Sequence, residues 1–248
     1  HELNQPGCYR DVKDTTCTAQ FRIVRDERSE HLFAGAEGEL FFLAWTTTPW
    51  TLPSNMCLAV GASLTYAYVE VENEIFVAGK ETLANFEKVF GKEPKIVKEC
   101  VGADLVGKSY EPLFNYFASE QEEHPTIFTV VTADYVGSDE GVGIVHTAPA
   151  FGEDDYWTCK NNHVPLVNPV DAKGRFTADV TDFYPMQGEK NVIEMNPIVI
   201  RFLYENGKAV ADGTIEHNYP HCWRCKRPLI YKAMDAYYFD IGKIKNRL

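Results

Sequence analysis

The sequence has no long apolar run and no surplus of positive charge. Its longest apolar stretches fall well short of the roughly 18 residues that a membrane-spanning helix needs, so we expect no membrane partner. Lysine and arginine number 24 against 36 aspartates and glutamates, which gives a net charge of −12. Dedicated nucleic-acid-binding domains are usually basic. Any contact with nucleic acid must therefore use a local patch or depend on another domain.

Cysteines are scattered: of the seven, Cys222 and Cys225 alone form a C-x-x-C pair. This is no disulfide framework, so we expect a reducing compartment, the cytoplasm. The pair has the spacing of zinc ligands, but a structural zinc site needs four of them. We expect either half of a zinc site, whose other ligands lie outside this chain, or an ordinary thiol pair. A zinc-ribbon binding protein remains a rival interpretation.

Common signatures of catalysis are also missing. The sequence contains no G-x-S-x-G nucleophile elbow and no G-x-G-x-x-G dinucleotide motif, and we expect no Walker-type phosphate loop. Cys57 lies near a threonine cluster and Cys159 near His146, which suggests a cysteine–histidine hydrolase. Neither cysteine stands in a nucleophile motif, however, and free cysteines are usually core residues.

What is present is enough apolar sequence for one sizeable folded unit. The chain has 248 residues, 45% of them hydrophobic, and because it starts at His1 without a signal-like segment we expect a fragment of a longer protein. Residues 1–20 are polar and predict an irregular segment. Apolar and β-branched runs bounded by turns predict strands at 39–47, 56–60, 65–71, 72–79, 126–136 and 141–149. Helices are predicted at 80–90 and from Asn196, taken as N-cap, to Gly207. The expected fold class is α+β, mainly β, with a few peripheral helices.

One stretch, "FFLAWTTTPWTLPSN" from Phe41 to Asn55, sets three hydroxyls side by side where an apolar strand ends. Successive side chains of a strand point to opposite faces, so at least one threonine must point inward and find a partner. Pro49 favours an extended conformation at Thr48. Taken alone, this is compatible with ordinary turn chemistry.

A second stretch, "GVGIVHTAPAFGEDDY", runs from Gly141 to Tyr156. Its two glycines allow a strand to pass close to a neighbouring group. His146 follows at the strand end, and Asp155 lies in the acidic start of a predicted helix, where the helix dipole favours negative charge. A histidine and a carboxylate placed in this way can face one cavity, although each is more often structural.

Together with "YPHCWRCKRPLIYKA", and in this order, these stretches resemble the editing domain of isoleucyl-tRNA synthetase, an insertion in the class I catalytic core. The resemblance covers about Phe41 to Tyr231. It implies a barrel-like editing domain over 1–248, with a core at about 20–216 and a segment at 217–248 that returns to the synthetase. Pro49-Trp50-Thr51 favours the isoleucyl branch, because valyl and leucyl relatives usually read T-x-R-P-E-T there. An editing domain of those branches, or a free-standing trans-editing protein, is the alternative.

The resemblance implies post-transfer proofreading. Water would hydrolyse the ester of valyl-tRNA(Ile), and cognate isoleucine would be rejected by its size. The implied partners are the 3′ end of tRNA(Ile) and the rest of the synthetase chain, and a monomer is expected. No cofactor is expected for this step. ATP would be used only by the missing synthetic domain, since nothing here resembles the HIGH or KMSKS signatures. A decayed, non-catalytic tRNA-binding module remains the rival.

Site residues are also carried over from the resemblance. The threonines would contact the terminal adenosine and the amino acid, His146 would gate the amino-acid pocket, and Asp155 would hold the α-ammonium group. The full expected set is Thr46, Thr47, Thr48, His146 and Asp155 as catalytic residues, with Trp45, Asn55, Thr147 and Ala148 as substrate-binding residues. The family often has Gly-His where this chain has Ala150-Phe151, which leaves no role for a second histidine.

Overall fold

The strands lie in two sheets in the computed structural model, which describes residues 5–36, 38–91, 93–138 and 141–245. The larger sheet has the order β6-β4-β5-β2-β1-β9, and the smaller sheet has the order β7-β3-β8. Their bounds are β1 (Tyr9–Arg22), β2 (Glu39–Thr46), β3 (Cys57–Val60), β4 (Thr65–Val71), β5 (Glu74–Gly79), β6 (Lys95–Val101), β7 (Thr129–Thr132), β8 (Val145–Thr147) and β9 (Ala209–Pro220).

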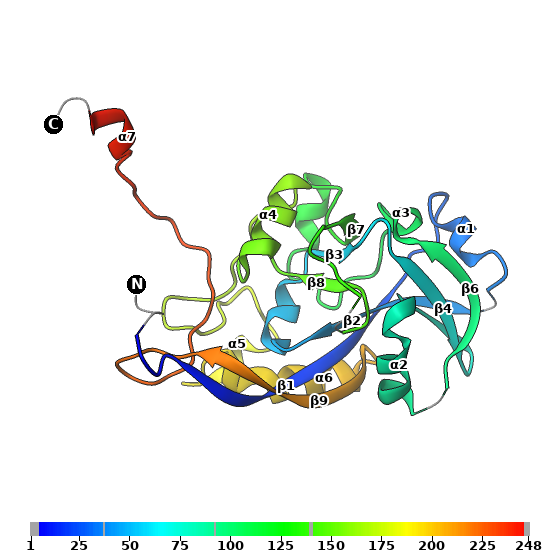
Figure 1. Cartoon of the computed structure of the whole chain (residues 1–248), viewed down its shortest axis with the longest axis horizontal. Helices are drawn as coiled ribbons and strands as arrows, with labels where there is room; N and C mark the ends of the chain where they lie inside the picture. Colours follow the sequence, from blue (N-terminus) through cyan, green and yellow to red (C-terminus); the bar gives the residue numbers. More distant parts are fainter. Residues whose placement is uncertain (1–4, 37, 92, 139–140, 246–248) are drawn as a thin grey trace.

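Short helices surround these sheets (Figure 1). The α-helices are α1 (Glu30–Phe33), α2 (Leu83–Phe90), α3 (Gly102–Leu105), α4 (Glu153–Asn161), α5 (Tyr184–Gln187), α6 (Asn196–Glu205) and α7 (Ile241–Ile244). The 3-10 helices are η2 (Pro49–Ser54), η3 (Lys80–Thr82), η4 (Ala118–Glu122) and η5 (Ile193–Met195). In the described part of the chain, no helix has the length and apolar character needed to span a bilayer.

Strand β2 is the centre of the fold. Every residue from Leu40 to Ala44 is buried. Alternate side chains of a strand face opposite sides of the sheet, and here the two sides belong to two separate apolar clusters. Leu40 and Phe42 lie in the main core, whereas Phe41 and Leu43 pack in the smaller cluster with Phe76. This double burial explains why "ELFFLAW" reads as a continuous apolar run and not as an alternating one.

The prediction of an irregular N-terminal segment is wrong. Tyr9–Arg22 forms the long strand β1, which pairs antiparallel with β9 from Tyr9↔Pro220 to Ala19↔Ala209. The far half of this ladder extends as a two-stranded ribbon (Figure 1), in which half-buried residues of β9 alternate with exposed ones and the first residues of β1 are mostly exposed. The first residues of β1 are mostly polar, so no apolar run marked this strand in the sequence.

Several other predicted boundaries need correction. The strands expected at 126–136 and 141–149 shorten to β7 and β8. Phe128 has a positive φ just before β7, and the glycines at 141 and 143 have positive φ angles before β8, so the chain leaves the ladder at these points. Asn196 is the first residue of α6 and not its N-cap. Its side chain instead accepts a hydrogen bond from the backbone N–H of Trp50, at 2.9 Å.

The α+β class dominated by strands is confirmed, but the barrel-like form is not. Among the described residues, the larger sheet ends in β6 on one side and β9 on the other, and these edges do not pair. Beyond Pro220 the chain turns back through a short bridge between His221 and Pro228. The final segment with α7 then stands away from the body (Figure 1).

Candidate active site

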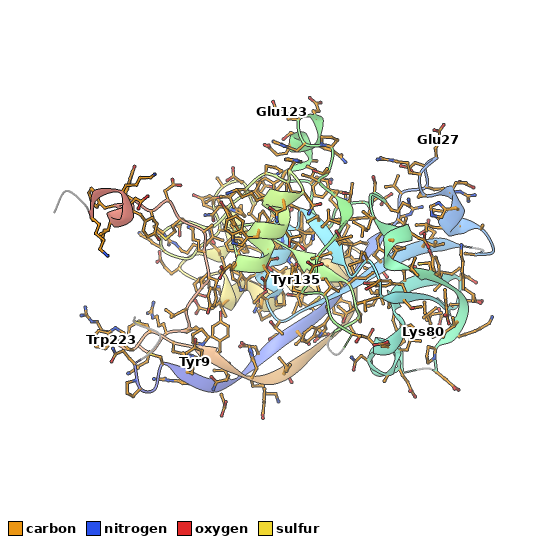
Figure 2. The ribbon with its side chains drawn as sticks, turned by 45° about the horizontal axis from the view of Figure 1, so that its top comes forward. Tyr9, Glu27, Lys80, Glu123, Tyr135 and Trp223 are labelled. Atoms are coloured by element: carbon orange, nitrogen blue, oxygen red, sulfur yellow. The ribbon has the colours of Figure 1, made fainter. Side chains whose placement is uncertain are left out.

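The threonine stretch ends β2 and turns immediately into η2. Pro49 takes the first position of that 3-10 helix, where its missing N–H costs nothing. A cavity of about 460 Å³ opens beside this turn, and Trp45, Thr46 and Thr47 form one wall. Tyr135, His146 and the strip from Gly141 to Val145 form the other. Figure 2 shows Tyr135 near the middle of the molecule.

The threonine hydroxyls form a continuous hydrogen-bonded chain. Thr46 Oγ1 accepts from the backbone N–H of Thr48 at 3.0 Å and lies 3.2 Å from the Thr48 hydroxyl. The Thr48 hydroxyl lies 3.3 Å from that of Thr51, and Thr51 Oγ1 lies 3.0 Å from Nε2 of His146. We expected at least one threonine to point inward and find a hydrogen-bond partner, and the buried Thr46 has two in Thr48. The chain connects the end of β2 to the opposite wall of the cavity.

His146 is held inside the protein as a neutral ring. It lies on β8 opposite Leu58 of β3 and is 7% exposed. Burial lowers the pKa of His146 to about 3, since desolvation disfavours the charged imidazolium. At neutral pH the ring is therefore uncharged, and one nitrogen donates while the other accepts.

Asp155 lies in the first turn of α4. Its Oδ1 accepts from the backbone N–H of Ala148 at 2.9 Å, which ties the helix start to the end of β8. Burial raises the pKa of Asp155 to about 6, against the opposing effect of that hydrogen bond. Burial and the Asp155 charge together raise the pKa of Tyr135, so the carboxylate acts electrostatically on a residue of the cavity wall. A cation beside Asp155 would be strongly favoured.

The glycine strip is fastened to the larger sheet. The N–H of Gly79 donates to the carbonyl of Val142 at 2.8 Å, and the Tyr66 hydroxyl donates to the carbonyl of Gly143 at 2.9 Å. Gly141 has a φ of 63° and packs against Trp45, where a Cβ would lie 3.4 Å from the indole ring. The strip and Trp45 therefore define the width of the cavity between them.

Not every expected site residue lines this cavity, and Asp155, which was expected to face one cavity with His146, is among those that do not. Asn55, Thr147 and Ala148 are at most 5% exposed and lie behind it, with Ala148 serving Asp155 through its backbone. Thr48 lines a smaller cavity of about 130 Å³ on the other side of the turn. Thr51 was missed as a site residue. The run "TTTPWT" offered a signal, because Thr51 lies three residues after Thr48, one turn of a 3-10 helix.

The pattern of a phosphate loop occurs after all, although we expected none. Gly102–Ser109 reads GADLVGKS and matches G-x-x-x-x-G-K-S. Such a loop binds phosphate with free backbone N–H groups that lead into a helix. Here the N–H groups of Gly102, Ala103 and Gly107 donate to the carbonyls of Leu64, Ala62 and Val130. The helix α3 lies inside the pattern and none follows Ser109 directly, so this segment is structural.

Cys222 and Cys225 lie in the tight turn beyond β9, where Cys222 N–H donates to the carbonyl of Arg227. The neighbouring His221 uses Nδ1 to donate to the carbonyl of Tyr219 at 2.9 Å. Among the residues that the structure describes, no three His, Cys, Asp or Glu side chains group as metal ligands. A zinc site completed from outside the chain remains a proposal.

Curated relatives align with the chain over all or nearly all of its length. The isoleucine–tRNA ligase of Treponema denticola is 38% identical over 100% of the chain, which covers 24% of that protein. The same enzyme of Clostridium novyi is 39% identical over 100% of the chain and 22% of that protein. The probable cytoplasmic isoleucine–tRNA ligase of Dictyostelium discoideum is 39% identical over 97% of the chain and 22% of that protein. The chain thus spans about a quarter of the length of the relatives it matches.

Solved structures share the fold at low identity. GlLeuRS-CP1 superimposes with a TM-score of 0.58 over 80% of this chain and 99% of that chain, at 14% identity. The editing domain of the P. knowlesi cytosolic leucyl-tRNA synthetase superimposes with a TM-score of 0.54 over 84% of this chain and 98% of that chain, at 10% identity. No family model matches the chain. Likeness at such identity establishes a common fold.

Proposed function

The chain belongs to the isoleucine–tRNA ligase family, as a segment with the fold of an editing domain, and from this premise we propose that it hydrolyses mischarged aminoacyl-tRNA. The substrate in this proposal is the valine ester at the 3′ end of tRNA(Ile). One observation carries the proposal: a chain of hydroxyls runs from Thr46 to the neutral ring of His146 at the wall of a 460 Å³ cavity.

The need for a second site follows from the size of the discrimination. Isoleucine and valine differ by one methylene, which an apolar pocket resolves by only about 1–3 kcal/mol, a magnitude established for isoleucine–tRNA ligase itself and not obtained from this structure. A hydrolytic cavity that excludes the larger side chain corrects the remaining errors. In our proposal His146, buried and unable to move aside, sets that size limit.

The chemistry is attack of water on the ester carbonyl. The developing oxyanion needs hydrogen-bond donors that are already in place, because fixed donors in a poorly hydrated site stabilise the charge far more than water molecules do. Thr46 lies in the cavity wall, and its hydroxyl hydrogen can turn from the Thr48 hydroxyl toward a bound substrate. We assign no cofactor to this step, because water is the nucleophile and hydroxyls are the donors.

Asp155 is the proposed anchor of the substrate's α-ammonium group. Desolvation raises its pKa, and no cation among the described residues lowers it. A substrate ammonium group would supply that cation and favour the ionised carboxylate. Because a paired carboxylate is a poor proton acceptor, this assignment gives Asp155 a binding role and not that of a general base.

The test is deacylation of valyl-tRNA(Ile) and isoleucyl-tRNA(Ile) by the chain and by Asp155→Ala. We expect the valyl ester to be lost, the isoleucyl ester to persist, and the variant to be inactive although folded. The same substitution in a full-length ligase should release mischarged tRNA. Equal hydrolysis by chain and variant contradicts the role of Asp155. Hydrolysis by neither the chain nor the full-length ligase favours the decayed tRNA-binding module.

A further inference from the structure

A second hydrogen-bond chain runs from His146 away from the cavity into the core. Nδ1 of His146 lies 2.8 Å from Nδ2 of Asn55, and Oδ1 of Asn55 accepts from the Tyr110 hydroxyl at 2.6 Å. Asn55 is 5% exposed and Tyr110 2%. Neither side chain lines the 460 Å³ cavity. Both can therefore act on a substrate only through His146.

The orientation of the Asn55 amide follows from its neighbours. Nδ2 lies 3.0 Å from the carbonyl oxygen of Cys57, which can only accept a hydrogen bond. The nitrogen must therefore face Cys57 and His146, and the oxygen must face Tyr110. The Tyr110 phenol keeps its proton, because burial raises the pKa of Tyr110 well above its usual value. All three contacts of the amide are then satisfied with one arrangement of hydrogens.

This arrangement decides the tautomer of His146. Since the amide donates to Nδ1, that nitrogen holds a lone pair, and the single proton of the neutral ring lies on Nε2. Nε2–H then donates to Thr51 Oγ1 at 3.0 Å. Thr51 is free to accept, because its own hydrogen goes to the carbonyl of Thr48 at 2.8 Å. Two chains of hydrogen bonds thus agree on one protonation state of the ring.

We propose that Tyr110 and Asn55 are positioning residues that hold His146 as a neutral Nε2–H donor toward the threonine hydroxyls. The inference rests on the proposed hydrolysis for its catalytic meaning. In this state His146 does not take a proton from the attacking water, because its basic nitrogen faces Asn55 and not the cavity. His146 instead orients the Thr51 hydroxyl and, through it, the hydroxyls of Thr48 and Thr46.

The tautomer can be read directly by nuclear magnetic resonance. The 248-residue chain with ¹⁵N-labelled histidine gives long-range ¹H–¹⁵N correlations, and the His146→Gln variant assigns the His146 signals. We expect a proton on Nε2 that persists from pH 8 to pH 5. Asn55→Asp replaces the donor on Nδ1 with an acceptor of nearly the same shape. This variant should move the proton to Nδ1 and raise the pKa of His146 by about 1–3 pH units.

Kinetics supply the second readout. Tyr110→Phe removes one hydroxyl and keeps the ring, so Asn55 loses its anchor. We expect kcat for deacylation to fall roughly tenfold with KM within about twofold, because substrate contacts are intact and orientation is lost. Tyr68→Phe is the matched control: Tyr68 is fully buried in β4, where Lys98 lies over its ring, and it takes no part in the site. That variant should keep the wild-type rate.

The outcomes separate this inference from the proposed function. A proton on Nδ1 in the wild-type chain, or no change of tautomer in Asn55→Asp, overturns the inference whether or not the chain hydrolyses anything. A wild-type kcat in Tyr110→Phe overturns the positioning role of Tyr110. If the tautomer is as expected but no deacylation occurs in chain or full-length ligase, the proposed function fails while the assigned state of His146 stands.

Discussion

Gly79 and Gly143 meet backbone to backbone, and their contact joins the larger sheet to the wall of the cavity. Gly143 has a φ of 78°, and a Cβ at this position would lie 2.7 Å from Gly79 Cα and 2.9 Å from its nitrogen. Real Cβ atoms do not approach other atoms so closely. The glycine strip therefore keeps its place only while both positions lack a side chain.

Gly143→Ala should destabilise the chain by about 2–4 kcal/mol, combining a left-handed backbone with a steric clash. Gly107→Ala is the control, because Gly107 has a φ of 74° but no atom within 4 Å of the added Cβ. That substitution should cost only about 1 kcal/mol. Chemical denaturation measures both free energies of unfolding. An equal loss of unfolding free energy in the two variants would show that the close approach of Gly143 to Gly79 does not affect stability.

Asp155→Asn should trade activity for stability. The half-buried carboxylate is partly desolvated, which raises its pKa to about 6 and makes its charge costly at neutral pH. An amide keeps an oxygen for the N–H of Ala148 and carries no charge. We expect the variant to be about 1–2 kcal/mol more stable at pH 8. Its deacylation rate should fall to background. A less stable Asp155→Asn variant would contradict the view that burial of the charge is costly.

The pH dependence of stability should have opposite signs in two variants. His146 has a folded pKa near 3 against 6.5 for the free group, so its contribution is complete above pH 6.5 and is lost as the pH falls toward 3. Asp155 titrates near 6 in the folded chain against 3.8, so protonation stabilises the fold between these values. As the pH falls from 6 to 4, Asp155→Asn should lose stability relative to His146→Gln by about 2 kcal/mol per pH unit.

Thermal and urea denaturation from pH 8 to pH 4 check this divergence. Groups common to both variants cancel in the difference between the two curves. Parallel curves would mean that burial does not shift the pKa of His146 or of Asp155.

Activity should depend on the ionisation of Asp155. If the carboxylate binds the α-ammonium group, kcat/KM for valyl-tRNA(Ile) should rise with pH through about 6, as the free enzyme loses this proton, and fall again near pH 8, where an α-ammonium group loses its own proton. The uncatalysed hydrolysis of the ester must be subtracted at each pH. A profile that is flat from pH 5 to pH 8 would remove Asp155 from substrate binding.

Thr51→Val should interrupt the hydroxyl chain at its junction with His146. The substitution leaves Nε2–H without an acceptor, which costs about 1–3 kcal/mol for a buried polar group. It should also lower kcat. Thr51→Ser keeps the hydroxyl and should retain most of the stability and most of kcat. Should Thr51→Ser be as damaging as Thr51→Val, packing of the methyl group, and not the hydrogen bond, would explain the effect.

Much of the central fold could be predicted from the sequence, because local pattern and tertiary position agree there. The double burial of β2 makes 39–46 an unbroken apolar run, and η3 with α2 and α6 fall where helices were expected. The α+β class followed from these elements. The open form of the sheets did not, because edge pairing depends on contacts between strands far apart in the chain.

Of the residues expected from the sequence, Trp45, Thr46, Thr47 and His146 line the cavity, but the hydrogen bonds that connect them to the core were not expected. The threonines, His146 and Asp155 stand out in the sequence because polar groups follow apolar strands. Tyr110 could not be found in this way, since its bond to Asn55 spans 55 residues and "KSYEPLF" shows no periodic pattern. The partners of the Asn55 amide depend on how η2, β3 and β8 pack together.

The β1–β9 ladder has a consequence for synthesis of the protein. Its strands lie nearly 200 residues apart, and it is the outermost pairing of the larger sheet. A ribosome therefore completes β2, β8 and α4 before β9 emerges, and until then β1 presents an unpaired edge that can join other chains. Because Thr18 pairs with Trp45 and Cys17 with Thr46, the strand β2 that ends in the threonines belongs to a sheet that is completed last. Nascent chains stalled between α6 and β9 should be the form most prone to aggregate.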